Sequence, residues 1–594
     1  MQTVKKILFL LTSSEIKKAI LLLIMILVMA LLDMLGVASI LPFMAVLSSP
    51  EIIETNAIYN EMFEISKNFG VENAQHFIFG LGVLLFILLV SSISFKALTL
   101  YVQVRFVQMR QYSLSKRLVE RYLNQPYSWF LNRNSAELGK TILTEVNQVI
   151  GSGVRPLLDL IAGIFVTIAI VGLLVITNTK ISMIIGFSLI LAYSIVLMIS
   201  RKYLHKFGDQ RLKANELRFI SVSEAFGAAK EIKIGGLEKI YLKRFSDPAH
   251  IFARAITKAS IFAEFPRFVF EIIAFGGILL VTLYLMTQTG NFSDVLPILS
   301  LFVFAGYRLM PALQKIYASI ATLTYIGPSL DKLYDDIKLL KKTDQYQHQN
   351  TLSINKAVTL KNIHFNYPNT TRTALKNINI SIPVKSTVAL VGATGSGKTT
   401  IVDIILGLLE AQKGNLEVDG QIITKQNLRA WQQSIGYVPQ NIFLADDTIA
   451  ANIALGVETK DINQLALEKA SKIANLHEFV VSELPKKYQT SVGERGVRLS
   501  GGQRQRIGIA RALYHDPQVL ILDEATSALD NQTEKAVMDA VNNIKKDITI
   551  ILIAHRLNTV KNCDIIFKID KGQLISEGTF KDLIDPVENS NTII

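Results

Sequence analysis

A short segment in the second half of the chain has the residue types and spacing of a phosphate-binding loop. Gly392–Thr399 reads GATGSGKT and directly follows Thr387–Val391, an apolar run that predicts a buried strand. Glycines let the backbone turn its N–H groups inward around phosphate oxygens, and the positive end of the next helix adds to the attraction. In this pattern Lys398 reaches the outer phosphates and the Thr399 hydroxyl can ligate Mg²⁺. The segment therefore predicts a nucleoside triphosphate site.

A second apolar run, Val519–Leu522, ends in two acidic residues. An acid at such a strand end, here Asp523, can hold Mg²⁺ opposite the phosphate-binding loop. The next carboxylate, Glu524, is then placed to orient or deprotonate an attacking water molecule. Alone, this pattern more often marks a strand that leaves the core. After a phosphate-binding loop, the catalytic interpretation is favoured.

The segment Leu499–Gln503 reads LSGGQ, and together with the loop it resembles the signature of ABC-type ATPases. Ser500 and the amides of Gly501 and Gly502 are expected to open a helix and form another anion site. The resemblance implies that this segment, including Gln503, covers the γ-phosphate bound to a second copy of the chain. Two ATP molecules would then be hydrolysed at two composite sites of a dimer. Because the chain carries one full set of motifs, it resembles a half-transporter that dimerises. No motif residue is degenerate, and a homodimer is favoured over a heterodimer.

The remaining ABC motifs occur in the family's order. Tyr367 is similar to the aromatic residue that stacks on adenine, and Gln440 to the glutamine that links Mg²⁺ to the membrane part. Thr490–Gly496 resembles the exporter X-loop, Ser527–Asp530 the D-loop, and His555 the switch histidine that contacts the γ-phosphate. The resemblance implies catalytic roles for Glu524 and His555 and Mg²⁺ ligation by Thr399, Gln440 and Asp523. The nucleotide-binding residues that it implies are Tyr367, Gly392, Thr394, Gly395, Ser396, Gly397, Lys398, Thr399, Thr400, Gln440 and Asp523.

The composition places these motifs in a chain with two environments. Of its 594 residues, 50% are apolar and only 19% are charged, and the charges are sparse in the first half. This balance points to a membrane-embedded part. The net charge of +13 is assigned to cytoplasmic loops beside apolar segments, which argues against nucleic acid as a partner. The only cysteine, Cys563, excludes an intramolecular disulfide and is interpreted as a buried or incidental thiol.

A helix needs about 20 mostly apolar residues to cross the hydrocarbon core. Such segments occur near residues 19–45, 77–101, 156–177, 181–200, 268–287 and 293–313. The first could imitate a signal peptide, but its apolar stretch is longer than an h-region, which favours a retained span. The connections 102–155 and 201–267 are basic, whereas 48–76 is acidic. The N-terminus and both basic loops are therefore expected to face the cytoplasm, with membrane lipids around the spans.

The expected architecture is an all-α transmembrane domain of the ABC exporter type followed by an α/β P-loop NTPase domain. The expected boundaries are 1–340 for the first domain, 341–352 for a linker and 353–594 for the second. The two basic loops are too long for mere connectors, so the spans are expected to continue as helices. Their turning points, near 127–130 and 224–227, carry aromatic residues that either contact a partner domain or pack within the helical extensions. The acidic 48–76 loop has the pattern of a short amphipathic helix.

Ionisable residues that lie in or directly beside the apolar spans include Asp33, Lys96, Arg267, Glu271 and Arg308. Such residues are costly in the membrane and usually face a cavity or a partner. If Lys96, Arg267 and Arg308 line one cavity, they suit an anionic group such as pyrophosphate. The alternatives are interhelical ion pairs, a pair within one helix, and snorkelling toward an interface.

The segments Phe265–Arg267, Tyr307–Pro311 and Tyr437–Ile442 resemble lipid-linked oligosaccharide flippases of bacterial protein glycosylation. That resemblance implies export of a polyprenyl-pyrophosphate glycan across the cytoplasmic membrane, an external helix in the first outer loop, and contacts of the three basic residues with pyrophosphate. The alternatives are an exporter of a drug, a lipid A-like glycolipid or a peptide. A non-transporting regulator or a soluble ABC ATPase fits less well, because the six spans and the catalytic pattern oppose it.

Overall fold

The computed structural model describes residues 2–68, 70–71, 73–177, 179–289, 292–340, 351–368, 373–524, 531–544, 547–554 and 560–583. The chain forms two compact units, which we describe one at a time. The first unit comprises Met1–Gln125 and Asn132–Thr343, and the second comprises Pro126–Leu131 and Asp344–Ile594.

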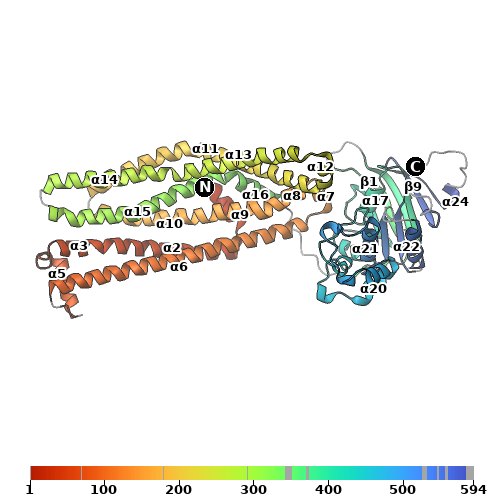
Figure 1. The fold of residues 1–594 in the computed structure, drawn as a ribbon, viewed down its shortest axis with the longest axis horizontal. Helices are drawn as coiled ribbons and strands as arrows, with labels where there is room; N and C mark the ends of the chain where they lie inside the picture. The colour runs from red at the N-terminus through yellow and green to blue at the C-terminus, as the bar shows by residue number, and fades with distance from the viewer. Residues whose placement is uncertain are drawn as a thin grey trace. The chain divides into compact units, whose positions relative to one another are not determined.

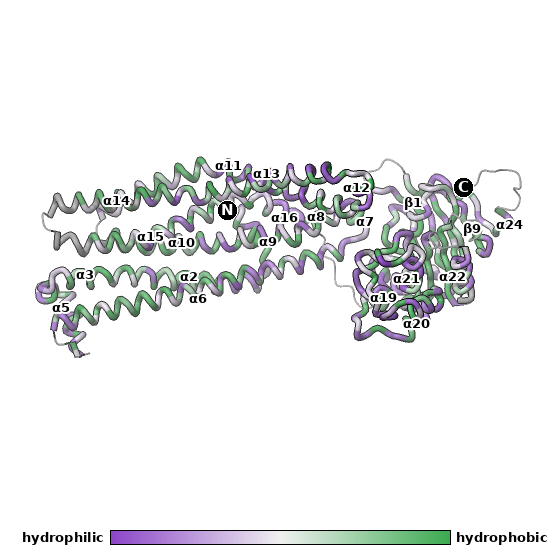
Figure 2. Tube along the Cα trace, viewed as in Figure 1, coloured by the Kyte–Doolittle hydropathy of each residue, from purple (hydrophilic) through white to green (hydrophobic). Residues whose placement is uncertain are grey.

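Helices make up the first unit, and several of them are long (Figure 1). They are α1 (Gln2–Leu10), α2 (Ser13–Ala38), α3 (Ile40–Ser48), α4 (Ile52–Thr55), α5 (Ala57–Lys67), α6 (Ala74–Leu123), α8 (Ser135–Lys140), η1 (Thr141–Glu145), α9 (Val146–Val149), η2 (Ile150–Val154), α10 (Arg155–Thr177), α11 (Thr179–Gly227), α12 (Ala229–Gly235), α13 (Glu238–Glu264), α14 (Pro266–Thr289), α15 (Phe292–Tyr325) and α16 (Gly327–Leu339). Figure 2 shows hydrophobic residues along α2, α3 and α10, whereas hydrophilic residues gather along α13 near α12.

Helices occupy the predicted spans. Within the described residues, four helical stretches are long and apolar enough to cross a membrane: Ser13–Ser48, Ala74–Leu123, Ser135–Thr177 and Ser182–Gly227. Helices α14 and α15 lie where the fifth and sixth spans are predicted. The first span differs from the prediction because the helix is interrupted at Ser39. Pro42, in the first turn of α3, has no N–H to continue the hydrogen-bond ladder, which favours a new helix start at this point.

The long basic loops continue the spans as helices, as predicted. Helix α6 has 50 residues, which corresponds to a length of about 75 Å and far exceeds a bilayer core. Helix α11 has 49 residues, and the stretch from Ser135 to Thr177 runs through two π-helical segments, η1 and η2. The turning point Tyr127–Phe130 forms helix α7, which belongs to the second compact unit. The turning point near 224–227 is the end of α11.

The acidic 48–76 connection contains the predicted short helix, α5. Its Asn56 cap accepts a hydrogen bond from the amide of Ile58. The ring of Phe63 packs edge-on against Phe77 of α6, with ring centres 5.3 Å apart. Carboxylates on the other face remain exposed, so the helix is amphipathic as its sequence predicts.

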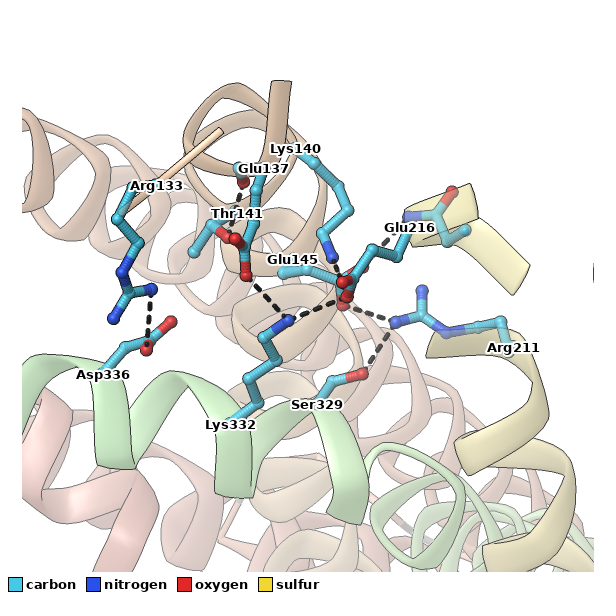
Figure 3. A network of polar contacts seen from close by, with 11 residues as sticks. Arg133, Glu137, Lys140, Thr141, Glu145, Arg211, Glu216, Ser329, Lys332 and Asp336 are labelled. Atoms are coloured by element: carbon cyan, nitrogen blue, oxygen red, sulfur yellow. Dashed lines mark hydrogen bonds and ion pairs between the residues drawn. The ribbon is translucent and has the colours of Figure 1, made fainter. Parts of the chain in front are cut away.

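A buried ionic network joins α8, η1, α11 and α16 (Figure 3). Arg211 and Glu145 are both 4% exposed and form a close ion pair. Asn215 and Ser329 complete this part of the network, since Asn215 donates to Glu145 and Arg211 donates to Ser329. Because both charges are hydrogen-bonded as well as paired, their burial is compensated.

The second part of the network is centred on Glu216. It accepts hydrogen bonds from Lys140 at 3.0 Å and from Lys332 at 2.9 Å, and Lys332 also pairs with Glu137 at 3.1 Å. The Lys140 side chain is fully buried. Although burial opposes ionisation, these ammonium groups lower the pKa of Glu216. The network therefore ties α16 to the two long loops of the helical unit (Figure 3).

The second unit contains two sheets (Figure 1). The strands are β1 (Ala357–Phe365), β2 (Leu375–Pro383), β3 (Thr387–Val391), β4 (Lys413–Val418), β5 (Gln421–Ile422), β6 (Ile435–Val438), β7 (Val519–Asp523), β8 (Thr549–Ile553), β9 (Ile565–Asp570) and β10 (Gln573–Gly578). The main helices are α17 (Lys398–Ile405), α18 (Leu428–Gln433), α19 (Ile449–Ile453), α20 (Gln464–Ile473), α21 (Gly501–Leu513) and α22 (Asn531–Ile544).

The larger sheet has the strand order β10-β9-β3-β8-β7-β6. Strands β9, β3, β8, β7 and β6 are parallel, so their carboxyl ends lie at one edge. This is where parallel α/β sheets place their ligands. The smaller antiparallel sheet, of order β2-β1-β4-β5, is not predicted by the sequence analysis. Cys563 is buried at 7% exposure in the core of this unit.

Candidate functional site

The loop after β3 has the backbone shape that a phosphate cradle requires. Gly392, Gly395 and Gly397 all have positive φ, at 150°, 77° and 109°. A Cβ on Gly392 would lie 2.0 Å from the carbonyl oxygen of Ile569, so no other residue fits there. A Cβ on Gly395 would meet nothing within 4 Å, so the space beside this residue is open.

Lys398 begins α17 and closes the loop. Its ammonium donates hydrogen bonds to the carbonyl oxygens of Gly392 at 2.8 Å and Ala393 at 3.1 Å. Burial lowers the pKa of this lysine, while the carboxylates of Glu524 and Asp523 oppose the shift. Its ammonium thus sits inside the loop, between the backbone and the acidic strand end.

The loop also has hydroxyl and N–H groups that a phosphate-bearing ligand could use as hydrogen-bond donors. The Ser396 hydroxyl is buried and has no hydrogen-bond partner among the described residues. Thr394 and Thr399 are exposed at the same loop, so their hydroxyls are accessible. The helix α17 directs its first N–H groups toward this space. These donors match phosphate oxygens.

Two acidic residues and a glutamine lie at the carboxyl edge of the large sheet. Asp523 ends β7 at 5% exposure, and Glu524 follows with a left-handed φ of 49°. Gln440 follows the neighbouring strand β6 and donates a hydrogen bond of 2.8 Å to the Glu524 carboxylate. Since β6 and β7 are parallel neighbours, the fold brings together three residues that the sequence singled out.

A magnesium ion bound with nucleotide fits this edge. Among the described residues, no group of three or more His, Cys, Asp or Glu side chains is arranged to hold a metal by itself. Thr399, Gln440 and Asp523 offer a hydroxyl, an amide oxygen and one carboxylate. Mg²⁺ prefers such oxygen ligands and commonly shares them with substrate phosphates and water.

Two site residues escaped the sequence analysis. Tyr437, in β6, hydrogen-bonds to the Asp523 carboxylate, and burial followed by that charge raises its pKa. Asp403, in α17, is half-buried, and burial together with Asp523 raises its pKa to about 6. A sequence signal for Asp403 exists, because it lies one helical turn after Thr399 and faces the same side. Nothing in the local pattern around Tyr437 identifies its partner.

The predicted adenine-stacking residue also lies near the loop helix. The hydroxyls of Tyr367 and Thr400 are 3.1 Å apart, and the Tyr367 ring packs edge-on against Phe365.

Helix α21 begins at the LSGGQ segment, as predicted. Its cap, Ser500, accepts from the amide of Gln503 while the Gln503 side chain accepts from the amide of Ser500. This capping box presents the N-terminus of α21 at the surface with Gly501 and Gly502 in its first turn. His555 and Ser527–Asp530 lie outside the described residues.

The basic residues predicted for the spans divide into two groups. Arg308 of α15 donates to Asp33 of α2 at 3.0 Å, and Lys96 of α6 lies 3.6 Å from the same carboxylate. The structure therefore brings Lys96 and Arg308 together. Arg267 instead pairs with Glu271, one turn further along α14, at 2.7 Å.

The comparisons with known proteins agree with both units. A family model described as ABC transporter transmembrane region matches residues 19–307, and one described as ABC transporter matches residues 375–527. A protein of Saccharophagus degradans named ATP-dependent lipid A-core flippase is 34% identical over 485 residues, which cover 80% of this chain and 79% of that protein. A protein of the same name from Cupriavidus pinatubonensis is 30% identical over 476 residues, 79% of each chain.

A solved structure shares the fold over nearly the whole length. It is the structure of a bacterial Atm1-family ABC exporter with ATP bound, which aligns with a TM-score of 0.77 over 96% of both chains at 23% identity. This similarity confirms the predicted order of a helical transmembrane part and an α/β nucleotide-binding domain. The chain thus belongs to the ABC transporter family, as an exporter-type half-transporter whose ATP-binding domain hydrolyses ATP to drive transport.

Proposed function

We propose that this protein flips a lipid-linked, pyrophosphate-bearing glycan across the cytoplasmic membrane. The supporting observation is the convergence of Lys96 and Arg308 on Asp33, which leaves surplus positive charge within the helices. A phosphate or pyrophosphate on a lipid is the chemistry that such cations recognise. Arg267 is proposed to contribute from α14, although its present partner is Glu271.

The ATPase roles follow from the edge of the large sheet. Lys398 and the loop glycines bind the phosphates, and Tyr367 stacks on adenine. Thr399, Gln440 and Asp523 would hold Mg²⁺, which would supply positive charge to neutralise the phosphates. Glu524 orients or deprotonates water, and Gln440 supports its carboxylate through the 2.8 Å hydrogen bond. His555 contacts the γ-phosphate.

The working unit is proposed to be a homodimer with both ATP sites composite. Ser500, Gly501, Gly502 and Gln503 of one copy cover the γ-phosphate that the loop of the other copy holds. The capped, surface-lying start of α21 supports this role, because its first amides remain available to an anion. The ATP-binding domains lie in the cytoplasm, where ATP is present.

A second candidate cargo is a lipid A-like glycolipid. It is favoured by the names of the relatives from Saccharophagus degradans and Cupriavidus pinatubonensis. Both candidate cargoes combine sugars, a lipid and phosphate groups, so the same cation pair suits either one. A multidrug or peptide exporter fits less well, because neutral or cationic cargo gains nothing from these charges.

The test is ATP-driven translocation in proteoliposomes that contain the purified full chain. Pyrophosphate-linked polyprenyl glycans, lipid A, neutral drugs and ordinary phospholipids are compared side by side. We expect ATP-dependent movement of the pyrophosphate glycolipid, with the Glu524→Gln variant as the inactive control. Movement of lipid A alone would assign the second candidate, and movement of drugs alone would contradict both.

A further inference from the structure

Asp33 is the centre of the ion cluster within the helices. Its side chain is 3% exposed and accepts hydrogen bonds from the Ser92 hydroxyl at 2.6 Å and from Arg308 at 3.0 Å. The ammonium of Lys96 lies 3.6 Å away. Ser92 and Lys96 are one turn apart on α6, so both project from the same face toward α2.

The charges of this cluster do not cancel. Lys96 and Arg308 carry two positive charges, and Asp33 supplies one negative charge. Cations among apolar helices need a counter-charge, because burying them unpaired is costly. Asp33 therefore lowers the free-energy cost of placing the two cations among the helices when no other anion is present. The cluster still carries a net charge of +1.

Both cations also have N–H donors that do not bind Asp33. The Nε of Arg308 is buried and has no hydrogen-bond partner among the described residues. Lys96 is 46% exposed and lies beyond hydrogen-bond distance of Asp33, so its three N–H donors remain available. An incoming anion thus finds donors on both cations.

We propose that Asp33 is an internal counter-anion, which the anionic group of the cargo displaces from Arg308 and Lys96 and which recaptures them when the cargo leaves. This inference rests on the proposed function and adds a specificity-determining residue to it. Carboxylate and phosphate oxygens compete for the same donors. A neutral lipid cannot displace Asp33, so the exchange selects for anionic cargo. Because the Asp33 carboxylate competes for the same two cations, it also favours release of the cargo.

The exchange is tested by changing the cluster charge in both directions. The full chain in nanodiscs is titrated with undecaprenyl pyrophosphate, and the half-maximal concentration for ATPase stimulation is measured. Asp33→Asn removes the competing anion, so this concentration should fall about tenfold. Ser92→Asp adds a second carboxylate beside Lys96 and should raise it about tenfold. Thermal unfolding of each variant checks that it is folded.

A matched control removes the same charge elsewhere. Asp159 of α10 pairs with Lys315 at 3.7 Å and with Arg155 at 3.9 Å, so Asp159→Asn exposes two cations outside the cluster. It should leave the half-maximal concentration unchanged. An equal shift in this control would contradict the exchange and indicate a general electrostatic effect. Weaker binding in both cluster variants would also contradict it and indicate a structural role for the cluster.

The outcomes also separate this inference from the proposed function. If Asp33→Asn does not fold, an unchanged or lowered half-maximal concentration in Ser92→Asp still overturns the exchange. If wild-type protein responds to undecaprenyl pyrophosphate but neither cluster variant shifts the response, the role of Asp33 is wrong and the cargo class stands. If wild-type protein does not respond at all, the proposed function itself fails.

Discussion

The side-chain amide of Gln440 donates a 2.8 Å hydrogen bond to the carboxylate of Glu524. These residues follow adjacent parallel strands, β6 and β7, although a long stretch of sequence separates them. The left-handed backbone of Glu524, with a φ of 49°, turns the chain immediately after Asp523. The two carboxylates therefore lie in different surroundings. Asp523 is buried at the strand end, and Glu524 is hydrogen-bonded to the side chain of Gln440.

Replacing Glu524 by glutamine should separate ATP binding from hydrolysis. The amide keeps the size of the side chain but cannot accept a proton, so phosphate release should fall by about 10²–10⁴-fold. Binding of labelled ATP should persist, since the phosphate-binding loop is unchanged. Glu577→Gln, on the exposed face of β10, is the control and should hydrolyse ATP normally. Normal turnover in Glu524→Gln would contradict the assigned role.

Alanine at Gly392 should destabilise the second unit far more than alanine at Gly395. The Gly392 Cβ would lie 2.0 Å from the carbonyl oxygen of Ile569, which the backbone of β9 holds in place. The Gly395 Cβ would meet nothing within 4 Å, so its cost is limited to left-handed backbone strain. That strain is about 1–2 kcal/mol, whereas overpacking adds about 1–3 kcal/mol more. Thermal unfolding measures both, and equal shifts would contradict the close contact.

Asp403 should make stability depend on pH. Its pKa is about 6 in the folded chain, because of burial and Asp523, against about 3.9 for an unfolded carboxyl. The folded state thus binds the proton more tightly, and stability falls as pH rises from about 4 through about 6. Asp403→Asn should raise the free energy of unfolding by about 1 kcal/mol near pH 7.5, after allowance for solvent screening, and not near pH 4.5.

Asp419 is a control of opposite sign for that measurement. Despite some desolvation, hydrogen bonds from the backbone amides of Asn355, Lys356 and Ala357 lower its pKa. Its stabilising effect is present above the unfolded pKa and is lost as pH falls through the folded value. Asp419→Asn should therefore lower stability near neutral pH. Unfolding is followed in Mg²⁺-free buffer, and parallel shifts in both variants would contradict the assignment.

Breaking the buried pair of Arg211 and Glu145 should cost about 3–5 kcal/mol, because one charge remains unpaired in the interior. Arg211→Met is the test, and Arg211→Met with Glu145→Gln should recover part of the loss. The exposed pair of Lys233 and Glu238 provides the control, with a cost of at most about 1 kcal/mol for Lys233→Met. Similar melting temperatures for Arg211→Met and Lys233→Met would show that the network of Figure 3 adds little.

Arg308→Ala should reduce transport of the pyrophosphate glycolipid by about tenfold or more, because a charge-assisted contact is lost. ATP binding should be unchanged, since the substitution is in the helical unit. The control is Arg254→Ala, which removes an exposed arginine from α13. Glycolipid movement in proteoliposomes and labelled-ATP binding are measured in parallel. Undiminished transport in Arg308→Ala would exclude this arginine from the cargo site.

Local patterns were sufficient for much of the second unit. Strand β3 and the glycine loop coincide with the predicted segments, because an apolar run, glycine spacing and a helix start are encoded by neighbouring residues. The same holds for α21, whose capping box spans only Ser500 to Gln503. The positions of the long apolar helices were also predictable from the sequence, because the thickness of the hydrocarbon core sets the length of a spanning apolar segment.

Contacts between distant segments needed the tertiary structure. The sequence singled out Asp33, Lys96 and Arg308 separately, but only helix packing places the two cations on one carboxylate. Likewise, Tyr437 became a site residue because β6 lies beside β7 and reaches Asp523. Sequence alone thus predicted which residues can do chemistry, and it located the apolar segments that are long enough to cross a membrane. The fold decided which of them meet, because such contacts depend on packing between helices and strands that are far apart in the chain.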